Sequence, residues 1–139
     1  MDAVFLIGRI LFAPVFIASG VVAHLAQRKP TAEYAKAVGA PAPEVTVPLT
    51  GVMILLGGLS VLFGLWADVG AILLVLFLVP TTFIMHAFWK EEDPQAEQMQ
   101  MAMFMKNTAL TGGALIVLFL YDAYGDDAPV SLTGPLLFG

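Results

Sequence analysis

Four side chains that can do chemistry interrupt otherwise apolar stretches of this sequence: His24, His86, Lys106 and Asn107. An ionisable group inside a lipid bilayer costs at least about 2.5 kcal/mol, so such groups usually face a bundle interior or a water-filled cavity. All four lie nearest the same end of their apolar stretches, and a helical bundle would gather them there. Histidine can carry a proton, lysine supplies a cation, and asparagine both donates and accepts hydrogen bonds. The sequence therefore predicts one candidate ligand pocket formed by these residues.

Each of the four also has a purely structural interpretation. His24 would lie among lipid headgroups at the end of its helix. His86 would donate to a backbone carbonyl or bond Thr82 one turn earlier. Lys106 would extend to the membrane surface, and Asn107 would hydrogen-bond across helices. The pocket hypothesis rests on the four occurring together.

Two further charged residues mark the opposite end of the apolar stretches. Arg9 lies about two turns into the first stretch, and Asp122 ends the last one. If the two helices are antiparallel, the pair lies at similar depth, and a carboxylate would offset the cost of the cation. The sequence predicts an Arg9–Asp122 ion pair as a structural feature, with extension of Arg9 toward the terminus as the alternative.

Composition sets the protein class. The 139 residues are 59% hydrophobic and 12% charged, and the mean hydropathy is +0.87, which is typical of an integral membrane protein. The net charge of −5 argues against nucleic acid as a partner, and lipid is the expected surrounding. The chain has no cysteine, no metal-ligand cluster and no nucleotide fingerprint, so no cofactor is predicted within it. His24 and His86 are unfavourable as paired haem ligands because they end different helices. The chain is not expected to be an enzyme on its own.

The elements that position these residues are all predicted to be helices. The expected fold is an all-α, four-transmembrane-helix bundle with spans at about 4–25, 45–65, 69–89 and 97–121. Residues 1–124 form one domain, and residues 125–139 form a non-helical tail. A short interfacial helix follows Thr31, its expected N-cap, with Tyr34 at headgroup depth. A cleaved signal peptide is disfavoured because the N-terminus carries Asp2 and no small-residue cleavage site follows.

Helix packing should follow the small residues. In the first span, Arg9, Phe16, Gly20 and Gln27 fall on one helical stripe, which is expected to face protein. In the second span, glycines recur at seven-residue spacing and would let helix backbones approach closely. These glycines are Gly51, Gly57, Gly58 and Gly64. Pro80 predicts a kink in the third span.

The membrane orientation is predicted from the basic residues outside the spans. They flank the first and third loops, and none flanks the second turn or the tail. These residues are Arg28, Lys29, Lys36 and Lys90. The positive-inside rule therefore places the first and third loops in the cytoplasm and both termini outside.

Three segments together resemble a known family. They are Ser19-Gly20 after Arg9-Ile-Leu in the first span, His86 to Trp89 ending the third span, and Gln100 to Gly113 in the fourth. The chain resembles the DoxX family of small four-span bacterial and archaeal membrane proteins over roughly Phe5 to Tyr121. The chain departs from the family at two places. It has His24 where many members have a lysine, and its tail has no counterpart in the family pattern.

The resemblance implies a bacterial cytoplasmic membrane protein that works with other subunits. The family includes membrane subunits of a thiosulfate:quinone oxidoreductase. It therefore implies the small membrane subunit of a redox assembly, in contact with a quinone or a sulfur oxyanion. The alternative is a noncatalytic accessory or scaffold subunit of a respiratory or photosynthetic membrane complex. In that role the tail would dock on a partner subunit. The alternative is that the tail is a disordered chain end. A transporter or channel is disfavoured because the spans offer little polar lining.

Overall fold

A computed structural model describes residues 1–137, and this part of the chain is all-α. The elements are α1 (Asp2–Phe12), α2 (Pro14–Ala18), the π-helix η1 (Ser19–Ala26), α3 (Arg28–Ala37), α4 (Pro43–Phe63), α5 (Ala67–Met85), the 3₁₀ turn η2 (Phe88–Lys90), α6 (Pro94–Tyr124) and the 3₁₀ turn η3 (Gly125–Asp127). Within residues 1–137, four helical segments are long and apolar enough to cross a membrane. The predicted all-α, four-span architecture is confirmed.

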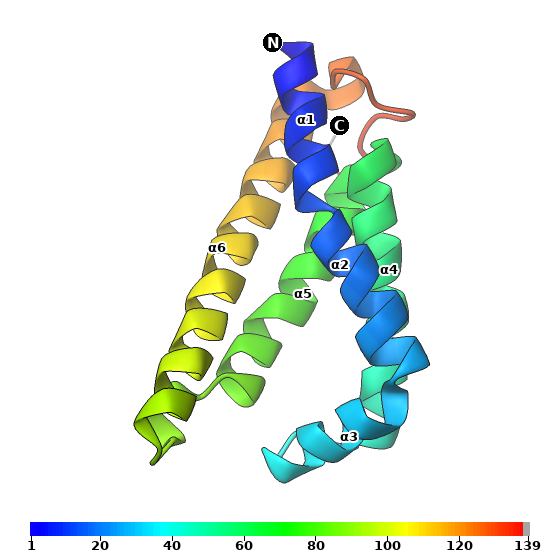
Figure 1. The fold of residues 1–139 in the computed structure, drawn as a ribbon. Coiled ribbons are helices and arrows are strands. Elements are labelled where there is room, and N and C mark those ends of the chain that lie inside the picture. Colours follow the sequence, from blue (N-terminus) through cyan, green and yellow to red (C-terminus); the bar gives the residue numbers. More distant parts are fainter. Residues whose placement is uncertain (138–139) are drawn as a thin grey trace.

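The spans pack together at the end with the N-terminus and spread apart toward the opposite end, where α6 and the end of α5 diverge from α3 and α4 (Figure 1). The first span consists of α1, α2 and η1 in succession, and α4, α5 and α6 are the other three. The N-terminus and the tail lie at one end of the bundle, and α3 crosses the opposite end (Figure 1). The first span packs chiefly on α4, and α6 packs chiefly on α5. The predicted interfacial helix of the first loop is therefore present, at the end where His24 and His86 lie.

Local chemistry explains where α4 and α6 begin and end. Pro43 and Pro94 occupy first-turn positions, where a missing N–H costs nothing. The Asp93 carboxylate accepts from Ala96 N at 2.8 Å and caps α6. Gly64 ends α4 in the left-handed conformation, at φ 62°. As a result α6 starts earlier and ends later than the predicted span at 97–121.

In the third span, the α-helix ends before residue 89, where the span was predicted to end. Helix α5 stops at Met85, and residues 88–90 form the separate turn η2. The turn brings Phe88 and Trp89 against Phe104 of α6, with ring centroids 5.5 and 5.8 Å apart. The edge-on contacts of these aromatic rings stabilise the α5–α6 hairpin in place of a further helical turn.

The first span differs from a continuous α-helix. Pro14 separates α1 from α2, and η1 is wider than an α-helix because its hydrogen bonds reach one residue further. Arg9, Phe16 and Gly20 are buried as predicted, but Gln27 is exposed. The prediction for Gln27 was wrong because the π-helix changes the register on which the stripe was counted.

The interfacial helix also begins differently from the prediction. It starts at Arg28, so Thr31 lies inside it and does not cap it. The Thr31 hydroxyl instead donates to the carbonyl of Ala23 at 2.7 Å. This bond ties α3 back to η1. Gly39 follows the helix at φ 86°, as expected for a residue just beyond a helix end.

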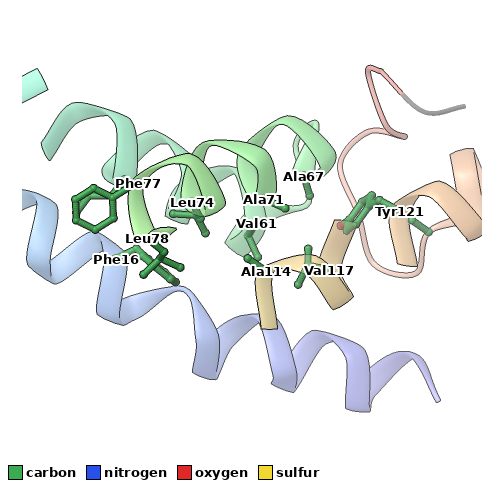
Figure 2. Close-up of a cluster of buried hydrophobic side chains, with 12 residues drawn as sticks. Phe16, Val61, Ala67, Ala71, Leu74, Phe77, Leu78, Ala114, Val117 and Tyr121 are labelled. Carbon is green, nitrogen blue, oxygen red and sulfur yellow. The ribbon is translucent and has the colours of Figure 1, made fainter. Parts of the chain in front are cut away.

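The main buried core lies between the middle of the bundle and the end with the N-terminus. Figure 2 shows its side chains, which come chiefly from α2, α4, α5 and α6 and extend from Phe77 to Tyr121. A separate small cluster near α3 consists of Ala32, Ala35 and Val47. Leu74 and Tyr121 are fully buried. The outward faces of the same helices carry exposed apolar side chains, as expected for surfaces that meet lipid.

The glycines of the second span form the predicted close contacts. A Cβ on Gly51 would lie 2.5 Å from the Cβ of His24, and one on Gly20 would lie 2.8 Å from the Gly51 carbonyl. On another face, a Cβ on Gly57 would lie 3.0 Å from the carbonyl of Gly70 in α5. The Gly20–Gly51 crossing thus sets α4 directly against the backbone that carries His24.

Candidate functional site

A cavity of about 350 Å³ lies at the loop end of the bundle, where α3 crosses. It is lined by Ser19, His24, Thr31, Ala35, Ala40, Pro41, Thr46, Val47, Thr50, Phe77, Pro80, Thr81, Ile84, Met85, His86, Lys106 and Asn107. All four residues of the predicted pocket are in this lining. They come from η1, the end of α5, and α6, so the fold brings together side chains that are far apart in the sequence.

His24 is fixed by its own helix. Its Nδ1 lies 3.0 Å from the carbonyl oxygen of Ser19, five residues earlier, and its ring lies edge-on to Phe77 at 5.6 Å. The Gly51 contact leaves no room for this part of the chain to shift. The ring is therefore held in the cavity lining by its own helix and by Phe77.

His86 marks the end of α5. Its backbone leaves the helix at φ −125°, and its carbonyl accepts from Phe88 N at 2.9 Å, closing the tight turn that follows. Its Nδ1 lies 2.9 Å from Oε1 of Gln100 on α6. The alternative bond to Thr82 is not made, because the His86 backbone leaves the helix and its Nδ1 faces Gln100. The Thr82 hydroxyl donates to Leu78 O at 2.6 Å. His86 is thus positioned by a neighbouring helix.

Asn107 and Lys106 are neighbours on α6 with different surroundings. Asn107 is 5% exposed, and none of the described residues forms a hydrogen bond with its side-chain amide. Lys106 is exposed, with Nζ 3.6 Å from Sδ of Met103 one turn earlier. Both residues line the cavity, and the unpaired Asn107 amide can bond a water molecule or a ligand there.

The cavity can hold a ligand with a polar head and an apolar body. Among the lining residues, the ionisable ones are basic or neutral: two histidines and one lysine, with no carboxylate. Phe77, Pro80, Ile84 and Met85 supply apolar wall. Within residues 1–137, no three acidic, histidine or cysteine side chains are grouped to hold a metal ion. The arrangement suits hydrogen bonding to a small head group.

Arg9, at the other end of the bundle, does not pair with Asp122, and that prediction was wrong. Arg9 is 2% exposed, whereas Asp122 is exposed. The guanidinium donates to Tyr121 Oη at 2.9 Å, to Ser131 Oγ at 2.9 Å and to backbone carbonyls, with Val130 O the closest at 2.7 Å. Tyr121 and Asp122 project about 100° apart on α6, and the inward position belongs to the tyrosine.

The tail supplies most of these acceptors. Residues 128–137 fold back over the α4–α5 turn, where Leu132 N and Thr133 N donate to Gly64 O at 3.0 Å. Tail carbonyls accept from Arg9. The disordered alternative for the tail is therefore wrong for the described part, and residues 138 and 139 lie outside it. We name residues 128–137 the strap.

Asp68 is a site residue that the sequence analysis missed. It is fully buried in the first turn of α5, and its carboxylate accepts from Leu136 N and Leu137 N at 2.7 to 3.0 Å. Its backbone donors lie 68 and 69 residues later, in the strap, so no local sequence pattern indicates them. Gln100 was missed as the partner of His86, and Tyr34 as the partner of Gln100, because these contacts join the end of α5 to α6 and to α3.

Comparison with known proteins supports a family assignment. The family model described as DoxX matches residues 4–87. The inner membrane protein YqjF of Escherichia coli strain K12 is 31% identical over 116 residues, which is 84% of this chain and 82% of that protein. No solved structure matches the chain.

Proposed function

Because the chain belongs to the DoxX family and carries a polar cavity at one end of four membrane-spanning helices, we propose that it is the small membrane subunit of a redox assembly that binds a quinone head group. Its relative YqjF is called an inner membrane protein, and we place this chain in the bacterial inner membrane as well. Electrons would come from a partner subunit, since the chain has no cysteine and no nucleotide fingerprint.

The observation that carries the proposal is the convergence of His24, His86, Lys106 and Asn107 on one cavity of about 350 Å³. A quinone ring with a short part of its tail fits a site of this size and character. The apolar walls would hold the ring, and the polar side chains would bond its oxygens. Reduction of a quinone takes up two electrons and two protons, and His86 is the group in the cavity suited to pass a proton.

The test is a double variant, Lys106→Met with His86→Ala, compared with Lys90→Met. Lys90 is outside the cavity lining, so its variant controls for loss of a lysine near the same membrane face. Purified chains in lipid nanodiscs are titrated with a short-chain quinone. We expect the double variant to lose at least about tenfold in quinone affinity, because Lys106 no longer donates to a quinone oxygen, and the control to keep it. Equal quinone affinity in all three chains would refute the proposal.

An accessory role is the second candidate, and the outward face of the strap favours it. Val130, Leu132, Leu136 and Leu137 are each more than half exposed although the strap backbone is bonded to the bundle. A fixed apolar ridge of this kind suits contact with another membrane subunit. Gentle purification from native membrane separates the roles. A large complex that keeps its composition and quinone-linked activity without this chain's cavity residues would favour the accessory role.

A further inference from the structure

His86 is the start of a chain of hydrogen bonds that joins three elements. Its Nδ1 lies 2.9 Å from Gln100 Oε1 on α6, and Gln100 Nε2 donates to the hydroxyl of Tyr34 on α3 at 2.8 Å. The Tyr34 hydroxyl donates to the carbonyl of Met85 at 3.5 Å. The series of hydrogen bonds that begins at His86 thus ends at Met85, the residue before it and the last residue of α5.

The direction of this chain is set by the Gln100 amide. Its oxygen lies 2.9 Å from His86 Nδ1, and its nitrogen donates to the Tyr34 hydroxyl at 2.8 Å. An amide oxygen can only accept, so His86 Nδ1 is the donor of the first bond. The contact of 3.5 Å from the Tyr34 hydroxyl to Met85 O is long for a hydrogen bond and adds little to this assignment.

The consequence falls on the other ring nitrogen. A neutral imidazole carries one proton, so a proton on Nδ1 leaves Nε2 as an acceptor. No hydrogen-bond partner for His86 Nε2 occurs in the described part of the chain, and the residue lines the cavity. At this position the cavity offers a lone pair. A ligand there must bring a proton of its own.

Lys106 and Asn107 do not impose the same demand. Asn107, 5% exposed and without a side-chain partner within residues 1–137, can donate as well as accept. Lys106 only donates. His24 has the same polarity as His86, because its Nδ1 faces the Ser19 carbonyl, which can only accept, and its Nε2 is left as a second acceptor. Acceptor atoms of a ligand can therefore be met at Lys106 and Asn107, whereas the two histidines require a donor.

We propose that the cavity selects a hydroxylated aromatic head group, a hydroquinone or phenol, over the corresponding quinone, with the ligand hydroxyl donating to His86 Nε2. This selectivity rests on the proposed function, because it concerns the same cavity. Gln100 is a positioning residue that holds the imidazole in the tautomer with the proton on Nδ1, and Tyr34 holds Gln100. A quinone carbonyl or a sulfur oxyanion, which only accepts, finds no donor at neutral His86.

The tautomer is measured directly, without any ligand. The chain has two histidines, so nitrogen-15 NMR of a histidine-labelled sample in nanodiscs gives few signals, and His24→Gln assigns them. At about pH 8.5, where free imidazole is neutral, we expect His86 to show a protonated Nδ1 and an unprotonated Nε2. Gln100→Leu should mix the two tautomers. A protonated Nε2 in the unaltered chain would overturn the inference whatever the cavity binds.

Ligand selectivity is measured with three compounds that share one ring: the hydroquinone, its dimethyl ether and the quinone. One lost hydrogen bond corresponds to about tenfold in affinity, and we expect the hydroquinone to bind tighter than both others by at least this factor. His86→Leu should remove the difference, and Lys90→Met should keep it. Equal binding of the three overturns the selectivity but leaves the proposed function intact. Binding of none of them overturns both.

Discussion

Arg9 is the most demanding single residue in the molecule. Its guanidinium is 2% exposed, and Nε has no hydrogen-bond partner within residues 1–137. The charge is met by neutral acceptors and by the ring of Phe5, 5.3 Å from the guanidinium carbon. A cation held in this way depends on every acceptor being present, since several carbonyl dipoles replace one carboxylate.

Replacing Arg9 tests this arrangement against the predicted ion pair. Arg9→Met leaves the Tyr121 hydroxyl and the Val130 carbonyl without their donor, and we expect a loss of about 2–4 kcal/mol in the free energy of unfolding. Asp122→Asn should change it by no more than about 0.5 kcal/mol, because the carboxylate is exposed. Thermal unfolding in detergent micelles measures both. Similar losses of unfolding free energy in the two variants would instead support an ion pair between Arg9 and Asp122.

At the residue scale, the sequence predicted which polar side chains are unusual better than which partners they have. His24, His86, Lys106 and Asn107 were chosen because polar groups are costly in lipid, and the fold places them on one cavity. Their role as a ligand site stays a prediction. Partners such as Gln100 for His86 depend on how three helices meet, which hydrophobic periodicity does not encode.

Among the elements, the crossing of η1 and α4 does most to shape the cavity. Gly20 and Gly51 allow the two backbones to touch, and His24 sits at the point of closest approach. The glycine spacing predicted this contact from sequence. The widening of η1 was not predictable in the same way, because a π-helix has no distinct apolar period, and it moved Gln27 off the buried stripe.

Two glycine variants test the crossing. Gly51→Ala would place a Cβ 2.5 Å from that of His24, and we expect it to cost about 1–3 kcal/mol through overpacking. Gly112→Ala is the matched control, since a Cβ there meets nothing within 4 Å and alanine favours helix by up to about 1 kcal/mol. Unfolding midpoints in micelles should therefore move in opposite directions. A tolerated Gly51→Ala would show that the crossing is looser than the structure has it.

The whole molecule has two different ends. The loop end carries the cavity, α3 and most basic residues, whereas the end with the N-terminus carries Arg9, Asp68 and the strap. The basic residues predict that the loop end faces the cytoplasm. A ligand head in the cavity would then lie toward the cytoplasmic side, and the strap would lie on the other.

Orientation is open to a simple experiment because the chain has no cysteine of its own. Single cysteines at the exposed positions Lys36 and Asp126 place one thiol at each end. In intact cells, a membrane-impermeant maleimide should label the Asp126→Cys chain and spare the Lys36→Cys chain, and opened membranes should label both. If only the Lys36→Cys chain were labelled in intact cells, the protein would have the opposite orientation to the predicted one.

The strap also constrains the order in which the protein can be made. Arg9 enters the membrane with the first span, but its acceptors at residues 129–131 are translated more than a hundred positions later. Until those residues leave the ribosome, the guanidinium must reach water or headgroups at the membrane surface. We therefore expect the first span to reach its final depth only after the strap has been synthesised. This end of the bundle would then be the last to mature.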